Sequence, residues 1–208
     1  MIKWRQWWAN LPFSKATLIP ISTVSVLMLA LFYGGHWFDA SAAFVYQREW
    51  ILAGEWWRLL TGALVHHDQP HLWLNILGLW LWWLLFIEHL SCWRDWCWLP
   101  VLLLSSTIAM LWLDPTTLVY AGFSGALYGL YAWGALADTF IRRWSGTAIG
   151  VGLLVKCGYD TLYLPSSSDI AVMAHWGGIS AGIGIALLRQ FLLQLSHKQK
   201  RHSAEQTR

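Results

Sequence analysis

The sequence predicts an all-α membrane protein with six transmembrane helices. Of its 208 residues, 57% are hydrophobic and only 12% are charged, whereas soluble domains carry about 25% charged residues. Several apolar runs approach the roughly 20 residues that a helix needs to cross a bilayer. Many of the 18 tryptophans lie near the ends of these runs, where indole rings favour the headgroup region. A soluble all-helical protein with a large core fits this composition poorly.

The predicted spans form one domain, residues 17–193, between a cytoplasmic N-terminal flank, 1–16, and a basic cytoplasmic tail, 194–208. The third span is expected to stop at Asp114-Pro115, because proline cannot continue the helical hydrogen-bond ladder. A long polar loop, 34–70, follows the first span. The spans are expected at residues 17–33, 71–87, 96–113, 123 or 124 to 141, 147–164 and 170–193.

The basic residues predict the orientation of the spans. Eleven of the fourteen Lys and Arg residues flank the side that holds both termini, and only Arg48 and Arg58 lie in the loops of the other side. The positive-inside rule therefore predicts that both termini are cytoplasmic. The basic tail is explained by this orientation, so no nucleic-acid partner is expected.

Three polar residues are predicted to meet at the outer membrane surface. The second, fourth and sixth spans all begin there, so His71, Ser124 and His175 lie at similar depth. Serine needs a base to remove its proton, and His175 is the candidate. Small-residue ridges beside both residues allow two membrane helices to approach closely; they comprise Gly125, Gly129, Gly178 and Gly182. Ordinary glycine packing around a structural serine and histidine explains the pair equally well.

Two polar residues of the second span favour catalysis. His71 and Asn75 are four residues apart and share one helical face, and polar residues at membrane depth indicate a site by default. With the Ser124 backbone N–H they are candidates for an oxyanion hole. The spacing of His66, His67 and His71 matches no common zinc pattern, so neither a metal nor another cofactor is expected.

Three further residues accompany this candidate site. Tyr128 lies one turn below Ser124 on the same face and can pack against the His175 ring, or serve as a core aromatic, or do both. Lys156 and Asp160, four residues apart in the fifth span, are expected to form an ion pair, which lowers the cost of placing each charge in the membrane. A structural role is the simpler interpretation of this pair.

At these positions the sequence resembles the rhomboid intramembrane serine proteases over residues 55–186. The motifs that carry the resemblance are Gly122-Phe123-Ser124-Gly125 with Tyr128, Ala-His-x-x-Gly around His175, His71-x-x-x-Asn75, and Trp57-Arg58. The resemblance implies a six-helix rhomboid-like bundle in a bacterial inner membrane. It implies Ser124 as nucleophile and His175 as general base and acid. It also implies an oxyanion hole of His71, Asn75 and the Ser124 amide, and supporting roles for Tyr128, His66, Gly122 and Gly125.

Within the family, the sequence is similar to the rhombosortases. The similarity lies in its compact length, in residues 127–136 and in Lys156 followed by Asp160, where those proteins more often carry glutamate. It implies cleavage of transmembrane substrates with glycine-rich, unwindable segments, the GlyGly-CTERM tails of secreted or surface proteins, near the periplasmic face of the bilayer. The polar first loop and the serine-rich loop 166–169 are expected to border the path of water to Ser124.

Three alternatives remain at this point. The first is a general rhomboid protease with other transmembrane substrates, and the second is a non-catalytic rhomboid-like protein that binds membrane helices. Proteins of the second kind usually lack the serine or the histidine, and this sequence keeps both. A small transporter fits less well, because the polar residues gather near one face of the membrane and not at its midplane.

Overall fold

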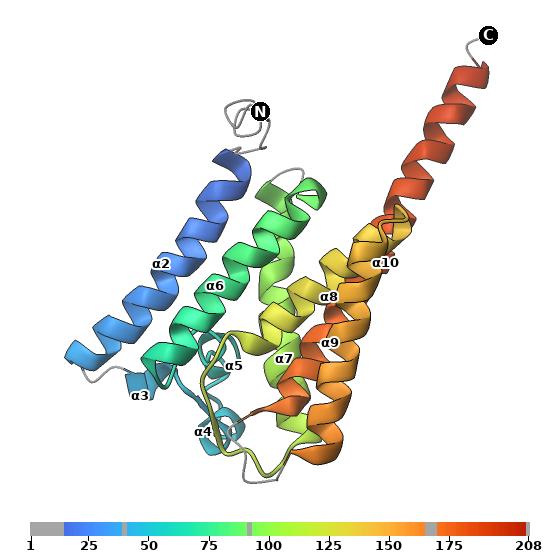
Figure 1. The fold of residues 1–208 in the computed structure, drawn as a ribbon. Helices are drawn as coiled ribbons and strands as arrows, with labels where there is room; N and C mark the ends of the chain where they lie inside the picture. Colours follow the sequence, from blue (N-terminus) through green and yellow to red (C-terminus); the bar gives the residue numbers. More distant parts are fainter. Residues whose placement is uncertain (1–14, 39–40, 91–92, 165–169, 207–208) are drawn as a thin grey trace, which may run out of the picture.

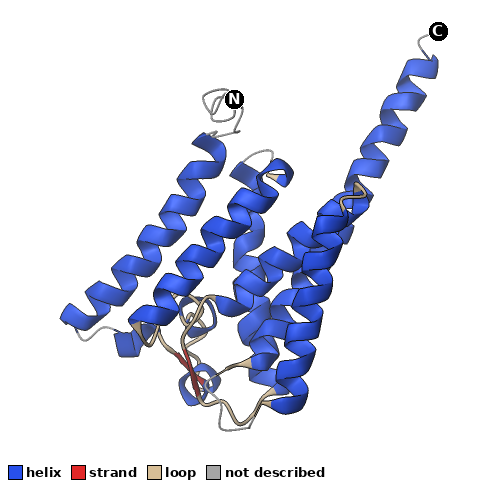
Figure 2. Ribbon diagram, viewed as in Figure 1, coloured by secondary structure: helices blue, strands red, loops and turns tan. Residues whose placement is uncertain are grey.

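The computed structural model describes residues 15–38, 41–90, 93–164 and 170–206, which are mostly helical (Figure 2). The long helices are α2 (Lys15–Phe38), α6 (Gln69–Phe86), α7 (Leu99–Leu113), α8 (Ser124–Phe140), α9 (Trp144–Tyr163) and α10 (Val172–Gln206). Between them lie short elements: α3 (Ser41–Phe44), β1 (Tyr46–Gln47), α4 (Arg48–Leu52), α5 (Arg58–Thr61), η1 (Ile87–His89), η2 (Trp93–Trp98) and β2 (Val119–Tyr120).

Several of the described helices are long and apolar enough to cross a membrane, so the protein is a multi-pass membrane protein. The four segments that meet this description are Thr17–Gly35, Gln69–His89, Arg94–Leu113 and Val172–Ser196. Helices α8 and α9 are not among them, and the count of six spans stays a prediction. The start of α2 and the end of α10 lie at the same end of the bundle (Figure 1), as an even number of crossings would place them.

Helix α8 lies at the centre of the bundle and packs against α6, α7, α9 and α10. Its buried positions are mainly small, because helices in lipid associate through close backbone packing and not through a hydrophobic driving force. These small buried residues are Gly125, Ala126, Gly129, Ala132, Gly134 and Ala135. A helix enclosed in this way exposes little surface to lipid and can therefore carry small residues in place of large apolar ones.

The helix boundaries lie close to the sequence-based prediction, with exceptions in α2, α6 and α10. Helix α2 ends at Phe38 and not at residue 33. Helix α6 begins at Gln69, because the Asp68 side chain accepts the His71 backbone N–H as an N-cap and Pro70 fits the first helical turn. Pro70, which the prediction placed at the end of the loop, therefore lies in the first turn of the helix. Helix α10 continues to Gln206, so most of the predicted basic tail extends the last helix.

The first loop is folded and joins the segment that precedes α8. Arg58 is buried, pairs with Glu55 at 2.6 Å and donates to the carbonyl oxygens of Ala42 and Val45. Strand β1 pairs with β2 in antiparallel register, Tyr46 opposite Tyr120. Since β2 ends four residues before Ser124, this pairing connects the loop to the N-terminus of α8.

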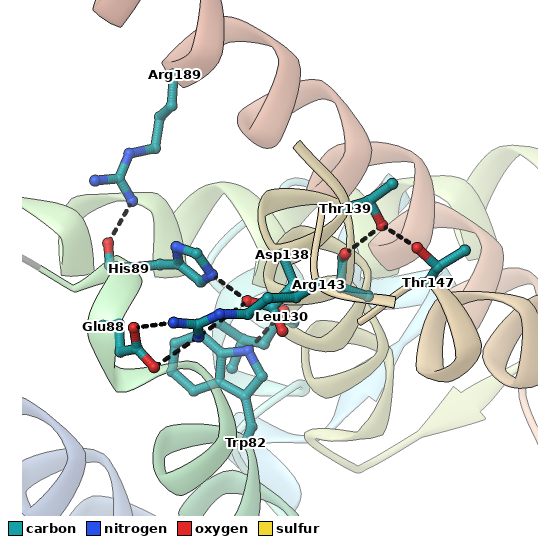
Figure 3. A network of polar contacts seen from close by, with 10 residues as sticks. Trp82, Glu88, His89, Leu130, Asp138, Thr139, Arg143, Thr147 and Arg189 are labelled. Atoms are coloured by element: carbon teal, nitrogen blue, oxygen red, sulfur yellow. Dashed lines mark hydrogen bonds and ion pairs between the residues drawn. The ribbon is translucent and has the colours of Figure 1, made fainter. Parts of the chain in front are cut away.

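A polar network ties four helices together at the opposite end of the bundle (Figure 3). His89 Nε2 donates to Asp138 Oδ1 at 2.7 Å, and Arg143 forms a bidentate ion pair with Glu88 at 2.5 and 2.6 Å. Arg189 of α10 donates to the His89 carbonyl oxygen at 3.0 Å and pairs with Asp95 at 2.8 Å. The network thereby joins η1, η2, the end of α8, the residue before α9 and the middle of α10, on the side where the sequence predicts the cytoplasm.

Candidate active site

Ser124 and His175 lie side by side. Ser124 is the first residue of α8, and His175 lies in the first turn of α10. The Ser124 Oγ and His175 Nε2 atoms are 3.1 Å apart, within hydrogen-bonding distance. His175 is only 6% exposed, whereas Ser124 is partly exposed. A hydroxyl of this kind is open to a substrate on one side and faces a base on the other.

Glycine contacts explain how the two helices come so close. A Cβ atom on Gly178 would overlap the Gly125 carbonyl oxygen, and one on Gly182 would overlap that of Gly129. The backbones of α8 and α10 therefore touch at two successive turns, with no room for a side chain. The glycine ridges that the sequence predicts form the contact that brings Ser124 and His175 together.

The Tyr128 ring lies flat against the His175 ring. The ring centroids are 4.0 Å apart and the planes differ by 1°. Tyr128 also packs in a small apolar cluster with Ala132, Cys157 and Ile179, so the residue is both a core aromatic and the neighbour of the histidine. The helical spacing from Ser124 predicted this position.

His71 lies against Gly122, the first residue of the short segment Gly122–Gly125 that leads into α8 and holds Ser124, here called the serine turn. A Cβ atom on Gly122 would sit 2.5 Å from the His71 ring, so only glycine lets the imidazole approach the backbone there. His66 contacts His71 edge-on at 5.2 Å between ring centroids. His71 therefore lies against the Gly122 end of the turn that leads into Ser124, and His66 packs against His71.

Asn75 is buried one turn further along α6, and its Nδ2 donates to His66 Nε2 at 3.0 Å. Burial, reinforced by the neighbouring His71, lowers the pKa of His66 to about 4. The neutral imidazole can accept this hydrogen bond at neutral pH. His66, for which the resemblance implies only a supporting role, thus binds and orients the Asn75 amide.

The expected ion pair between Lys156 and Asp160 is present in α9. The Asp160 side chain is 3% exposed and the Lys156 side chain 54%. Cys157, between them in sequence, packs with Tyr128 in the apolar cluster described above. The pair therefore lies on the α9 side of the Tyr128–His175 stack. The loop 166–169 lies outside the residues that the structure describes.

One residue near the site was not singled out by the sequence analysis. Tyr120, in β2, is buried, and its hydroxyl donates to the Gly122 carbonyl oxygen at 2.6 Å. A tyrosine four residues before the serine carries no recognised signal, and its position becomes meaningful only through the β1–β2 pairing. Within the described ranges, no group of three or more His, Cys, Asp or Glu residues is arranged to hold a metal ion.

A family model described as the rhomboid domain matches residues 53–190. The chain belongs to the rhomboid family. A Bacillus subtilis (strain 168) protein named "Putative rhomboid protease YdcA" is 26% identical over 138 residues, which cover 66% of this chain and 69% of that protein. Rhomboid membership implies intramembrane protease function. The matched region begins in the first loop and ends in α10, so it contains Ser124, His175 and every other predicted site residue.

Proposed function

We propose that this rhomboid is an intramembrane serine endopeptidase with a Ser124–His175 dyad. The observation that carries the proposal is the 3.1 Å separation of Ser124 Oγ and His175 Nε2 across two closely packed helices. A nucleophile and its base within hydrogen-bonding distance are the minimum that serine catalysis needs. The non-catalytic alternative gives no reason for this pairing in a partly open position.

The proposed reaction has two halves. His175 Nε2 takes the proton of Ser124 Oγ as the oxygen attacks the carbonyl carbon of the scissile peptide bond. The protonated histidine then gives this proton to the leaving amine, and an acyl-enzyme remains on Ser124. In the second half, His175 takes a proton from water as the water oxygen attacks the ester. The histidine then returns this proton to Ser124 Oγ, and the new carboxyl end is released. The stacked Tyr128 ring keeps the imidazole in the orientation that both halves require.

We assign the oxyanion hole to His71, Asn75 and the Ser124 backbone N–H. His71 lies beside Gly122 at the start of the serine turn, and the Asn75 amide is held by His66. The backbone N–H groups at the start of α8 lack partners within the helix and point toward its N-terminal end. Loss of one such donor lowers kcat by about 10²–10³ in serine proteases.

We place the reaction near the periplasmic face of a bacterial inner membrane. Helices α6, α8 and α10 begin toward the end of the bundle opposite the start of α2 (Figure 1), and the sequence predicts that α2 starts in the cytoplasm. A site near the outer surface gives water access to the acyl-enzyme, which a site at the bilayer centre would not.

The proposed substrates are proteins anchored by a transmembrane segment with a glycine-rich, unwindable stretch. A membrane helix hides its peptide bonds in its own hydrogen bonds, so it must unwind before Ser124 can attack. Each glycine lowers the cost of unwinding by about 0.8–1 kcal/mol relative to alanine. The similarity of residues 127–136 and of the Lys156–Asp160 pair to rhombosortases favours GlyGly-CTERM tails as the specific class. The alternative is a general rhomboid with other transmembrane substrates.

The dyad is tested by labelling the detergent-purified protein with a fluorophosphonate probe. The wild-type protein should be modified at Ser124, and Ser124→Ala and His175→Ala should each abolish labelling. Ser180→Ala, which removes an exposed serine of α10, is the matched control and should label normally. Normal labelling of the Ser124→Ala or His175→Ala protein would refute the dyad.

The substrate class is tested by co-expression with a reporter that ends in a glycine-rich tail, a transmembrane helix and a basic end. A shortened reporter should be released by the wild-type protein and not by Ser124→Ala. A matched reporter in which the glycines are replaced by leucines should stay intact. Cleavage of both reporters, or of neither while the enzyme labels with fluorophosphonate, would rule out the GlyGly-CTERM class in favour of other transmembrane substrates.

A further inference from the structure

We propose that Tyr120 is a positioning residue for the proposed reaction: its hydroxyl holds the Gly122 carbonyl and so fixes the turn that presents Ser124. The inference rests on the proposed function, because it concerns the same nucleophile. It adds a residue that stands outside the dyad and the oxyanion hole and that acts only through the backbone.

The hydrogen bond itself is short and shielded. The Tyr120 hydroxyl lies 2.6 Å from the Gly122 carbonyl oxygen, and both residues are buried. A hydrogen bond in a low-dielectric environment is stronger than one in water, and its loss leaves a buried acceptor without a partner. The Gly122 carbonyl belongs to the peptide plane that leads into Phe123 and Ser124. Freedom of this plane would change the direction of the first turn of α8.

The phenol reaches both sides of the nucleophile. Besides donating to the Gly122 carbonyl before Ser124, the hydroxyl lies near the Ser124 side chain and near the Gly125 backbone after it. A phenol has one proton, which goes to the Gly122 carbonyl, and its oxygen remains free to accept a hydrogen bond. Tyr120 is therefore bonded to the start of the turn in which Ser124 lies and is close to the residues that follow.

Tyr120 is itself held in place from the first loop. Its strand pairs with β1, where Tyr46 stands opposite, and the two rings meet edge-on with centroids 6.4 Å apart. The Gly122 N–H donates to the Gly62 carbonyl oxygen at 3.1 Å. A Cβ atom on Gly62 would lie 2.5 Å from the Tyr46 backbone nitrogen, so the first loop is packed backbone to backbone at the residue that accepts the Gly122 hydrogen bond. The Tyr120 ring is therefore held in one position, and its hydroxyl is held beside the Gly122 carbonyl.

The opposing tyrosine supplies a matched control. Tyr46 is as deeply buried as Tyr120, but its hydroxyl lies near the Arg48 side chain and makes no hydrogen bond to the turn that holds Ser124. Replacing either tyrosine by phenylalanine keeps the ring, its volume and the edge-on contact. Only Tyr120→Phe removes a hydrogen bond to the serine turn.

The test compares Tyr120→Phe, Tyr46→Phe and the wild-type protein, each normalised to folded protein by its thermal unfolding curve. We expect Tyr120→Phe to slow fluorophosphonate labelling of Ser124 by roughly 10- to 100-fold, as expected for a lost buried hydrogen bond. For a cleaved transmembrane reporter, kcat should fall by a similar factor with KM unchanged, because substrate binding is not touched. Tyr46→Phe should stay within about twofold of the wild type.

The outcomes separate this inference from the proposed function. Failure of the wild-type protein to label at Ser124 would refute the proposed function itself. A wild-type protein that labels, together with a Tyr120→Phe protein that labels and cleaves at the same rate per folded molecule, would refute only the role of Tyr120. A loss of thermal stability in Tyr120→Phe without a change in these rates would also overturn it, since it would show a purely structural residue.

Discussion

The ring of Tyr128 stacks in parallel on the ring of His175, with 4.0 Å between their centroids. The two residues come from different helices, α8 and α10, so the stack also records the close approach of these helices. An imidazole that is stacked on one face can rotate little about its Cβ–Cγ bond without losing the contact. The stack therefore links helix packing to the orientation of the proposed base.

We predict that the stacking ring, and not the phenol hydroxyl, is what Tyr128 contributes. An aromatic pair stabilises by about 0.5–1.5 kcal/mol beyond area burial, which corresponds to about 2- to 10-fold in rate if the stack holds His175 in place. Tyr128→Phe should retain nearly full kcat, and Tyr128→Leu should lose activity by that factor, measured with a cleaved reporter. Equal losses in both variants would assign the effect to the hydroxyl instead.

The contact between α8 and α10 should tolerate no side chain at Gly178. A methyl group there overlaps the Gly125 carbonyl oxygen, so Gly178→Ala must push the helices apart. Such overpacking typically costs about 1–3 kcal/mol and should break the Ser124–His175 hydrogen bond, abolishing fluorophosphonate labelling.

Gly184→Ala, in the same helix, is the control for this prediction. No atom lies within 4 Å of a Cβ placed there, and alanine favours a helix over glycine by about 0.8–1 kcal/mol. This variant should label normally and unfold no more easily than the wild type. Full labelling of Gly178→Ala would show that the backbone contact does not set the dyad geometry.

In the polar network of Figure 3, the buried carboxylate should matter more than the exposed one. The Asp138 side chain is 6% exposed and binds His89, whereas Glu88 is 52% exposed in its pair with Arg143. Breaking a buried pair costs about 3–5 kcal/mol, and an exposed pair contributes about 1 kcal/mol or less. Unfolding of Asp138→Ala and Glu88→Ala in mixed micelles should show this order, and a larger loss for Glu88→Ala would contradict it.

The loop after α7 should contribute a pH-dependent part of the stability. Burial alone would raise the pKa of Asp114, but hydrogen bonds from Thr116 and Thr117 outweigh it and hold the pKa below its ordinary value. Because the folded-state pKa is the lower one, the contribution is complete above the ordinary Asp pKa of about 3.9 and is lost as pH falls through the lowered value.

The measurement is the difference in unfolding free energy between the wild type and Asp114→Asn as a function of pH. This difference should be constant from neutral pH down to about pH 5 and should shrink below about pH 4. A difference that instead grew on acidification would mean that Asp114 is stabilised in its protonated form.

The count of six spans is tested with fusions of a green fluorescent protein and of an alkaline phosphatase. Fusions after Arg143 and at the C-terminus should fluoresce and lack phosphatase activity, because both positions are predicted to be cytoplasmic. A fusion after Pro115 should behave in the opposite way. Phosphatase activity at the C-terminus would require an odd number of crossings.

The sequence could predict the helices because each membrane span must by itself have the length and the apolar composition that the bilayer requires. Apolar runs of the required length and the stop at Asp114-Pro115 predicted where α7 ends and where α10 begins. Both boundaries lie within a few residues of the prediction. The proposed dyad was also predictable: Ser124 and His175 each begin a helix, and glycine ridges beside them indicate close approach. A 3.6-residue period is enough to place Tyr128 under Ser124.

The tertiary structure alone decided how the polar loop serves the site. Three contacts show this: His66 binds Asn75, Arg58 is buried within the folded first loop, and Tyr120 holds the Gly122 carbonyl. They depend on how the loop folds and on the pairing of β1 with β2. Such contacts cannot be predicted from the spacing of residues along a helix, because they are made by loop segments whose backbone is irregular. Local pattern determined where Ser124 and His175 stand along the chain, and long-range packing decided which groups hold them there.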